Sequence, residues 1–191
     1  VVPIAIYTDD DSFAKENLVY AKERYEELHK LFDNYKTYPD LVNVKTINDN
    51  AGIKPVTVDD TLFQLIKSSI DDYNNISHNT NIALGPVTKL WNEYRELYEG
   101  GKTKEEDIAL KGEALPSDEE LEKLRPLVNI DKIKLDDEKQ TVSLEKGMEL
   151  DLGATAKGFA TELVAKELED RGVKSCVISA GGNVRIIGKP T

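Results

Sequence analysis

The stretch LDLGATAKGFA, residues 150–160, places four small residues, GATA, between Asp151 and Lys157. Apolar residues then recur at helical spacing up to Gly172, which predicts an amphipathic helix from Thr155 to Arg171. Small residues where a strand gives way to a helix are typical of sites at which a ligand approaches the backbone closely. We expect the core-facing residues of this helix to be Phe159, Leu163, Val164 and Leu168.

Lys157 falls in the first turn of the predicted helix, where a cation is unfavourable because the helix dipole is positive there. An anionic ligand would reverse this effect, since the helix amides and the ammonium group could share a phosphate. Asp151 could hydrogen-bond a sugar or a base, or lie beside a metal. The alternative is a capped helix start with a solvated lysine, and spacing alone favours that alternative.

Alternating apolar and polar residues on both sides of this helix predict antiparallel strands. Before it, residues 131–152 alternate around a DDEK turn, which predicts a hairpin whose second strand ends at Leu152. After it, VKSCVISA and NVRIIGK predict two strands joined by Gly181 and Gly182, with Cys176 buried. The Gly181–Gly182 turn could admit a planar or phosphate-bearing ligand to the backbone, or it could simply be a tight turn.

The rest of the chain is mainly helical in pattern. VVPIAIY predicts a short strand, Asp11 or Ser12 and later Asp59 and Ser117 are candidate helix caps, and Pro86 opens a further helix. The whole predicts an α+β fold in which helices pack on a largely antiparallel sheet. We expect a single domain over residues 1–191, with a mobile, polar connection at 99–116.

Composition excludes several classes of function. A formal net charge of −11 argues against a nucleic-acid binder, which would present a basic face. One cysteine and two histidines argue against a zinc site of the usual ligands, and no apolar run is long enough to cross a bilayer. His29 falls on the first helix and His78 in a loop, and neither forms a convincing nucleophile–base pair. An enzyme of this sequence would therefore rely on positioning and a metal ion.

Taken in order, several segments resemble the FAD:protein FMN transferases, also called the ApbE or thiamine-biosynthesis-lipoprotein family. They are an early tyrosine loop (FDNYKTYPDLVNVKTIN), the helix that follows it (PVTVDDTLFQLIKSSIDDYNNIS), a Gly-Pro…Trp segment (NIALGPVTKLW), and DLGATAKGFATELVAKELEDRGV followed by ISAGGNVRIIGK. The last pair is the most specific of these segments.

The resemblance implies a T-fold-like architecture, bound FAD as substrate, and Mg²⁺. It further implies transfer of the FMN half of FAD to a threonine hydroxyl of an acceptor protein, with release of AMP. Carried over by position, Tyr35 would pack on the flavin side, and the main-chain oxygen of Ala154 would bind magnesium. The other candidate FAD-binding residues are Asn79, Thr80, Asn81, Asp151 and Lys157, to which we add Gly181 and Gly182 because of their small-residue turn.

The family's sequences continue past Thr191 with a His-x-x-Asp-Pro-x-Thr-Gly loop and a late Ala-Asp…Thr segment that supplies side-chain magnesium ligands. We therefore expect the chain to be the N-terminal portion of such a protein, with the C-terminal part missing, and to transfer no FMN by itself. The resemblance also implies an extracytoplasmic, lipid-anchored protein whose anchor would precede Val1.

Two other functions stay open. One is a non-catalytic flavin-binding or assembly module that uses the same pocket without turnover. The other is a flavinylated acceptor, since GATA loosely resembles the acceptor motif Ser/Asp-Gly-x-Thr-x-Ala-Thr and would make Thr155 the modified residue.

Overall fold

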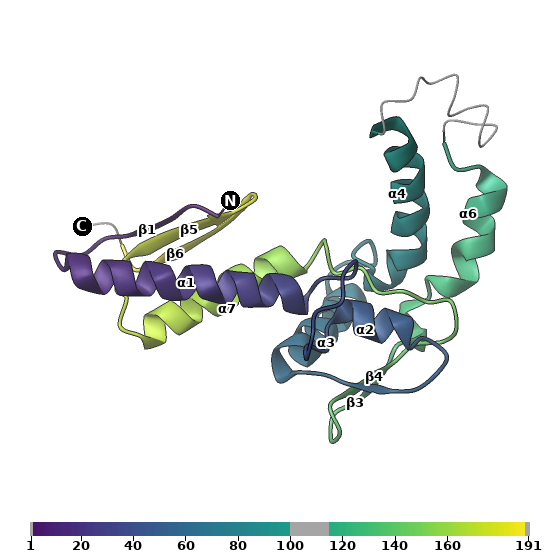
Figure 1. Ribbon diagram of the computed structural model, residues 1–191, viewed down its shortest axis with the longest axis horizontal. Helices are drawn as coiled ribbons and strands as arrows, with labels where there is room; N and C mark the ends of the chain where they lie inside the picture. The colour runs from purple at the N-terminus through teal and green to yellow at the C-terminus, as the bar shows by residue number, and fades with distance from the viewer. Residues whose placement is uncertain (1, 100–114, 190–191) are drawn as a thin grey trace. The chain divides into compact units, whose positions relative to one another are not determined.

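The computed structural model describes residues 2–99 and 115–189, and Figure 1 shows its helices and strands. The chain divides into two compact units. Unit 1 comprises Val1–Asp33 and Leu152–Thr191, and unit 2 comprises Asn34–Asp151. The expected single domain stays a prediction, and the expected connection at 99–116 lies almost wholly outside the described residues.

Unit 1 is built on a three-stranded antiparallel sheet. Its order is β1–β5–β6, with β1 at Ile4–Ile6, β5 at Cys176–Ala180 and β6 at Asn183–Ile187. Alternate residues of β5 are buried, including Cys176 as predicted, and burial raises the pKa of its thiol to about 11. Two long helices, α1 (Asp11–Leu31) and α7 (Ala156–Asp170), run side by side along the sheet (Figure 1).

Side chains on α1 and α7 join the two helices through polar contacts. Glu167 of α7 accepts a hydrogen bond from the Tyr20 hydroxyl at 3.0 Å and another from Nε of Arg24 at 3.0 Å. Arg171, which follows α7, lies 4.2 Å from the centre of the Tyr20 ring and donates to the buried Asn17 at 2.7 Å. These contacts fix the rotation of α7 against α1.

The buried face of α7 differs in part from the predicted one. Val164 and Leu168 are buried as expected, whereas Phe159 and Leu163 are only half-buried. Small residues occupy much of the buried face, and Phe159 packs on Phe32, at the end of α1, from a half-buried position. The buried residues of α7 are Ala160, Thr161, Val164, Ala165 and Leu168.

Unit 2 contains four described α-helices and a second small sheet, of order β2–β4–β3 and antiparallel throughout. Asn43, Asp59 and Ser117 cap three of these helices, the last two as predicted. The helices are α2 (Val44–Asp49), α3 (Asp60–Asn75), α4 (Gly85–Glu99) and α6 (Asp118–Leu124), the 3₁₀ turns are η1 (Ile82–Leu84), η2 (Arg125–Leu127) and η3 (Ile130–Lys132), and the strands are β2 (Val56–Thr57), β3 (Lys134–Asp136) and β4 (Thr141–Ser143).

The α+β class and antiparallel pairing are confirmed, but the sheet and the hairpin need correction. The described residues form two three-stranded sheets rather than one. The predicted hairpin around DDEK is present, yet its second strand, β4, ends at Ser143 instead of Leu152. Leu144, Met148 and Leu150 stay buried and so continue the apolar alternation, although no ladder extends through these described residues. An alternation of apolar residues indicates which side chains are buried, and in this segment the burial continues past the point where strand pairing ends.

None of the helices within residues 2–99 and 115–189 has the length and apolar character that crossing a membrane requires.

Truncating α7 residues should separate its true core face from its flank. Leu168 is 0% exposed, so Leu168→Ala should lower the free energy of unfolding by about 2–5 kcal/mol, because it leaves a cavity. Leu163→Ala should cost distinctly less, since that side chain is half-buried. Urea unfolding followed by circular dichroism measures both, and equal losses would contradict the assigned face.

Candidate functional site

In unit 1, the predicted ligand-binding residues gather at the start of α7. Thr155 precedes the helix, and its hydroxyl donates to the carbonyl of Leu152 at 3.5 Å. The main-chain amides of Thr155 and Ala156 turn back to the same carbonyl, at 3.1 and 2.8 Å. Gly153 and Ala154 are exposed at the bend that precedes the helix. Gly153 and Ala154 therefore leave the main chain accessible from solvent next to the positive end of the helix dipole, while the amides of Thr155 and Ala156 already donate to Leu152.

Lys157 and the Gly181–Gly182 turn lie next to each other. The Lys157 ammonium is 3.4 Å from the carbonyl oxygen of Gly153, and its side chain runs past Gly181. A Cβ added to Gly181 would lie 3.7 Å from Cδ of Lys157, whereas one added to Gly182 would point into open space. Both glycines have positive φ, 56° and 99°, which favours glycine in the turn between β5 and β6. The structure thus brings together an exposed cation, a bare turn and a helix start.

In unit 2, Asp151 lies beside the Asn79–Asn81 loop. The main-chain amide of Asp151 donates to the carbonyl of Ile82 at 2.9 Å. The side chain of Asn81 caps η1 by accepting from the amide of Ala83 at 2.8 Å, and it donates to the carbonyl of Val128 at 2.8 Å. The oxygen and the nitrogen of the Asn81 side-chain amide are therefore both used in hydrogen bonds within the protein. Asn79 is exposed and Thr80 is half-buried.

The segment that leads to Asp151 is held by close backbone contacts. The side-chain amide of Asn48 donates to the carbonyl of Leu150 at 3.0 Å and accepts from its N–H at 2.7 Å. Gly85, the first residue of α4, packs so tightly that an added Cβ would lie 2.3 Å from the carbonyl oxygen of Glu149. Only glycine permits this approach without a shift of the main chain.

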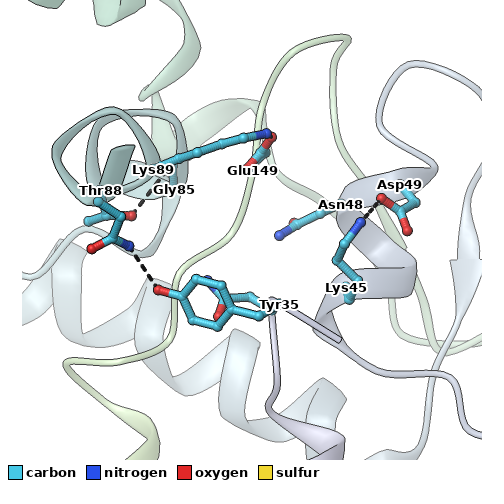
Figure 2. Close-up of a pocket in the computed structure, with 10 residues that line it drawn as sticks. Tyr35, Lys45, Asn48, Asp49, Gly85, Thr88, Lys89 and Glu149 are labelled. Atoms are coloured by element: carbon cyan, nitrogen blue, oxygen red, sulfur yellow. Dashed lines mark hydrogen bonds and ion pairs between the residues drawn. The ribbon is translucent and has the colours of Figure 1, made fainter. Parts of the chain in front are cut away.

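A pocket of about 250 Å³ in unit 2 opens beside this segment. Figure 2 shows Lys89 and Glu149 toward the top of the view, Lys45 and Asn48 at the right, and the ring of Tyr35 below Lys89. Ten residues line the pocket: Asn34, Tyr35, Lys45, Asn48, Asp49, Gly85, Thr88, Lys89, Asn92 and Glu149.

The charges around this pocket are paired. Lys89 lies 2.6 Å from Glu149, and this contact raises the pKa of the lysine, while Lys45 pairs with Asp49. The Tyr35 ring is 64% exposed, and its hydroxyl accepts a hydrogen bond from Asn92 at 3.0 Å. Sequence reasoning identified Tyr35 and the Gly85–Pro86 helix start but missed the rest. The Lys89–Glu149 pair joins distant segments and leaves no local sequence signal, whereas Lys45 and Asp49 lie four residues apart on one helix, a pattern that is common at helix surfaces.

The described residues do not themselves form a metal site. Within residues 2–99 and 115–189, no cluster of three or more His, Cys, Asp or Glu side chains could hold an ion. His29 is exposed on α1 as expected, and the ring of His78 lies 4.9 Å from that of Tyr73. Ala154, the predicted magnesium ligand, can offer only a main-chain oxygen.

The predicted site residues thus fall into two groups, one in each unit. The structure brings Lys157 to Gly181 in unit 1 and Asp151 to the Asn81–Ile82 loop in unit 2. Their roles in binding FAD or magnesium stay predictions.

Comparison with known proteins decides the family, because the model of the ApbE family matches residues 1–191. The chain belongs to the ApbE family. A FAD:protein FMN transferase from Klebsiella pneumoniae (strain 342) is 32% identical over 170 residues, which cover 85% of this chain and 49% of that protein. A FAD:protein FMN transferase from Haemophilus influenzae is 26% identical over 192 residues, which cover 96% of this chain and 50% of that protein. The chain therefore spans about half the length of these curated relatives.

Solved structures confirm the fold. The crystal structure of the ApbE protein from Thermotoga maritima matches with a TM-score of 0.77 and 24% identity, covering 99% of this chain and 56% of that one. The flavin transferase ApbE from Vibrio cholerae, as an H257G mutant, matches with a TM-score of 0.77 and 19% identity over the same shares of the two chains. The predicted ApbE architecture is thereby confirmed.

Adding one methyl group tests the contact between α4 and the segment before Asp151. Gly85→Ala should lower the free energy of unfolding by about 1–3 kcal/mol, because the new Cβ meets the Glu149 carbonyl at 2.3 Å. Gly158→Ala is the matched control in α7, where the nearest atom would lie at 3.5 Å. That change should be neutral or stabilise by up to about 1 kcal/mol. Thermal unfolding measures both variants. If Gly85→Ala is as stable as Gly158→Ala, the close contact between Gly85 and the Glu149 carbonyl is refuted.

Proposed function

We propose that this protein transfers the FMN half of FAD to a threonine hydroxyl of an acceptor protein and releases AMP. The observation that carries the proposal is the exposed Lys157 beside the bare Gly181–Gly182 turn, in a chain of the ApbE family. The relatives from Klebsiella and Haemophilus, both named FAD:protein FMN transferases, support it.

The chemistry requires charge neutralisation more than a strong base. The threonine oxygen would attack the phosphorus of the FMN half, and the bond from that phosphorus to the bridging oxygen would break. The bridging oxygen leaves with AMP, and the hydroxyl proton is released to solvent or a nearby base. Lys157 at the start of α7 would bind and orient the pyrophosphate, because the lysine adds its charge to that of the helix dipole.

Magnesium dependence is part of the proposal, and its support is the family resemblance. A bound magnesium ion would neutralise pyrophosphate charge. The described residues contain no cluster of acidic, cysteine and histidine side chains able to hold one. Ala154 would contribute its main-chain oxygen, and Asp151 is the nearest carboxylate in sequence.

The proposed partner is an acceptor protein with a threonine flavinylation motif, and the proposed location is extracytoplasmic with a lipid anchor. Both rest on the resemblance alone. Fractionation of cells, with and without detergent, would show whether the protein partitions with membranes through such an anchor.

Reversing the charge at Lys157 should weaken FAD binding. Lys157→Glu replaces the ammonium with a carboxylate at the positive end of α7, where it would repel the pyrophosphate. We expect the dissociation constant of FAD, measured by quenching of flavin fluorescence, to rise at least about tenfold. Lys166→Glu is the control, because it makes the same charge change on an exposed residue of the same helix. Equal effects of the two changes would show that only overall charge matters.

Removing divalent metal should stop transfer. With a chain extended through the family's C-terminal segments and an acceptor peptide that carries the threonine motif, EDTA should abolish in-gel flavin fluorescence of the peptide, and excess Mg²⁺ should restore it. Residues 1–191 alone should label no peptide under either condition. Labelling that resists EDTA would refute the metal requirement. Mass spectrometry of the protein itself separates the alternatives, since FMN attached at Thr155 would indicate an acceptor and FAD binding without any labelling would indicate a binding module.

A further inference from the structure

Two hydroxyl groups link α1 to the first turn of α7. The Thr161 hydroxyl donates to the main-chain carbonyl of Lys157 at 2.7 Å. The Tyr25 hydroxyl of α1 donates in turn to the Thr161 oxygen at 3.4 Å. The bonds therefore run in one direction, from α1 to the carbonyl of the residue that carries the candidate phosphate-binding ammonium.

Burial makes this link specific. Thr161 is only 3% exposed, so water cannot readily replace the carbonyl of Lys157 as the hydrogen-bond acceptor of its hydroxyl. Burial raises the pKa of Tyr25, so its phenol stays protonated and able to donate at neutral pH. A threonine hydroxyl that bonds four residues back along a helix is neutral to slightly destabilising for the helix itself. Its presence in a buried position thus calls for a further reason.

A second contact from α1 reaches the same turn. The ring of Phe159 packs edge to face on that of Phe32, at the end of α1, with 6.2 Å between ring centres. Two residues near Lys157 therefore contact α1: Phe159 through its ring and Thr161 through its hydroxyl. The ammonium itself is exposed.

We propose that Thr161, supported by Tyr25, is a positioning residue that holds the first turn of α7 so that Lys157 and the helix amides face the pyrophosphate of FAD. This inference rests on the proposed function. Neither hydroxyl needs to touch the ligand. Their effect is pre-organisation, because a turn that is already ordered loses less freedom when an anion binds it.

Removing the hydroxyl with a side chain of similar shape tests the proposal. Thr161→Val should raise the dissociation constant of FAD by about three- to tenfold, the range of one lost hydrogen bond, while Thr161→Ser should bind as the unchanged protein does. Ser69→Ala is the matched control, because the Ser69 hydroxyl makes the same kind of bond, to Leu65 at 2.7 Å, on a buried face of α3. It should leave FAD binding unchanged.

A double-mutant cycle separates positioning from general structural support. If Thr161 acts partly through Lys157, Thr161→Val should weaken FAD binding by a smaller factor once Lys157→Met is present than it does alone. Effects that multiply independently, or equal weakening by Thr161→Val and Ser69→Ala, would overturn the proposal.

Hydrogen exchange in the free protein keeps the test independent of the proposed function. Thr161→Val should speed exchange of amides in the first turn of α7 but not in its last turn, and Thr161→Ser should not. An unchanged first turn would overturn the proposal even if FAD binds. If the unchanged protein does not bind FAD, the proposed function fails, and the exchange result still decides whether Thr161 holds the turn.

Discussion

The side-chain amide of Asn48 pairs with both main-chain groups of Leu150, at 3.0 and 2.7 Å, as a neighbouring strand would. This pairing matters because β4 has already ended at Ser143, so the buried residues that follow have lost their ladder. A buried backbone group without a partner costs free energy comparable to a lost hydrogen bond. Asn48 supplies the missing partner, and Gly85 of α4 packs against the carbonyl of Glu149, the residue before Leu150. Asp151 follows these two fixed residues directly.

At the start of α7 the sequence accepts a local cost. Lys157 places a positive charge where the helix dipole is already positive, as Lys45 does in the short α2, whereas α1, α3 and α6 begin with acidic residues, as electrostatics favours. Lys45 pairs with Asp49 of its own helix, whereas the Lys157 ammonium contacts the carbonyl oxygen of Gly153. Natural sequences tend to break local rules where function requires it, and the start of α7 fits that pattern. The contacts from α1 to Thr161 and Phe159 help to offset that cost by holding the turn in place.

Sequence reasoning predicted the features that local chemistry determines. The caps at Asp59 and Ser117, the turn at Gly181–Gly182 and the helix start near Thr155 each follow from a few adjacent residues, and the structure confirms them. It failed where a distant partner decides. The strand predicted to reach Leu152 was wrong because Asn48, far away in sequence, replaces the ladder. Lys89 of the unit 2 pocket was missed because its carboxylate partner, Glu149, lies on a distant segment.

The buried face of α7 shows how tertiary contact changes the meaning of a sequence pattern. Large apolar residues at helical spacing suggested Phe159 and Leu163, yet the buried residues of α7 include the small Ala160, Thr161 and Ala165. Phe159 packs on Phe32, at the end of α1, from a half-buried position, and the Tyr25 hydroxyl of α1 reaches the buried Thr161 at 3.4 Å. The turn that holds Lys157 is therefore attached to α1 by a ring contact and a hydroxyl link, which apolar spacing alone does not predict.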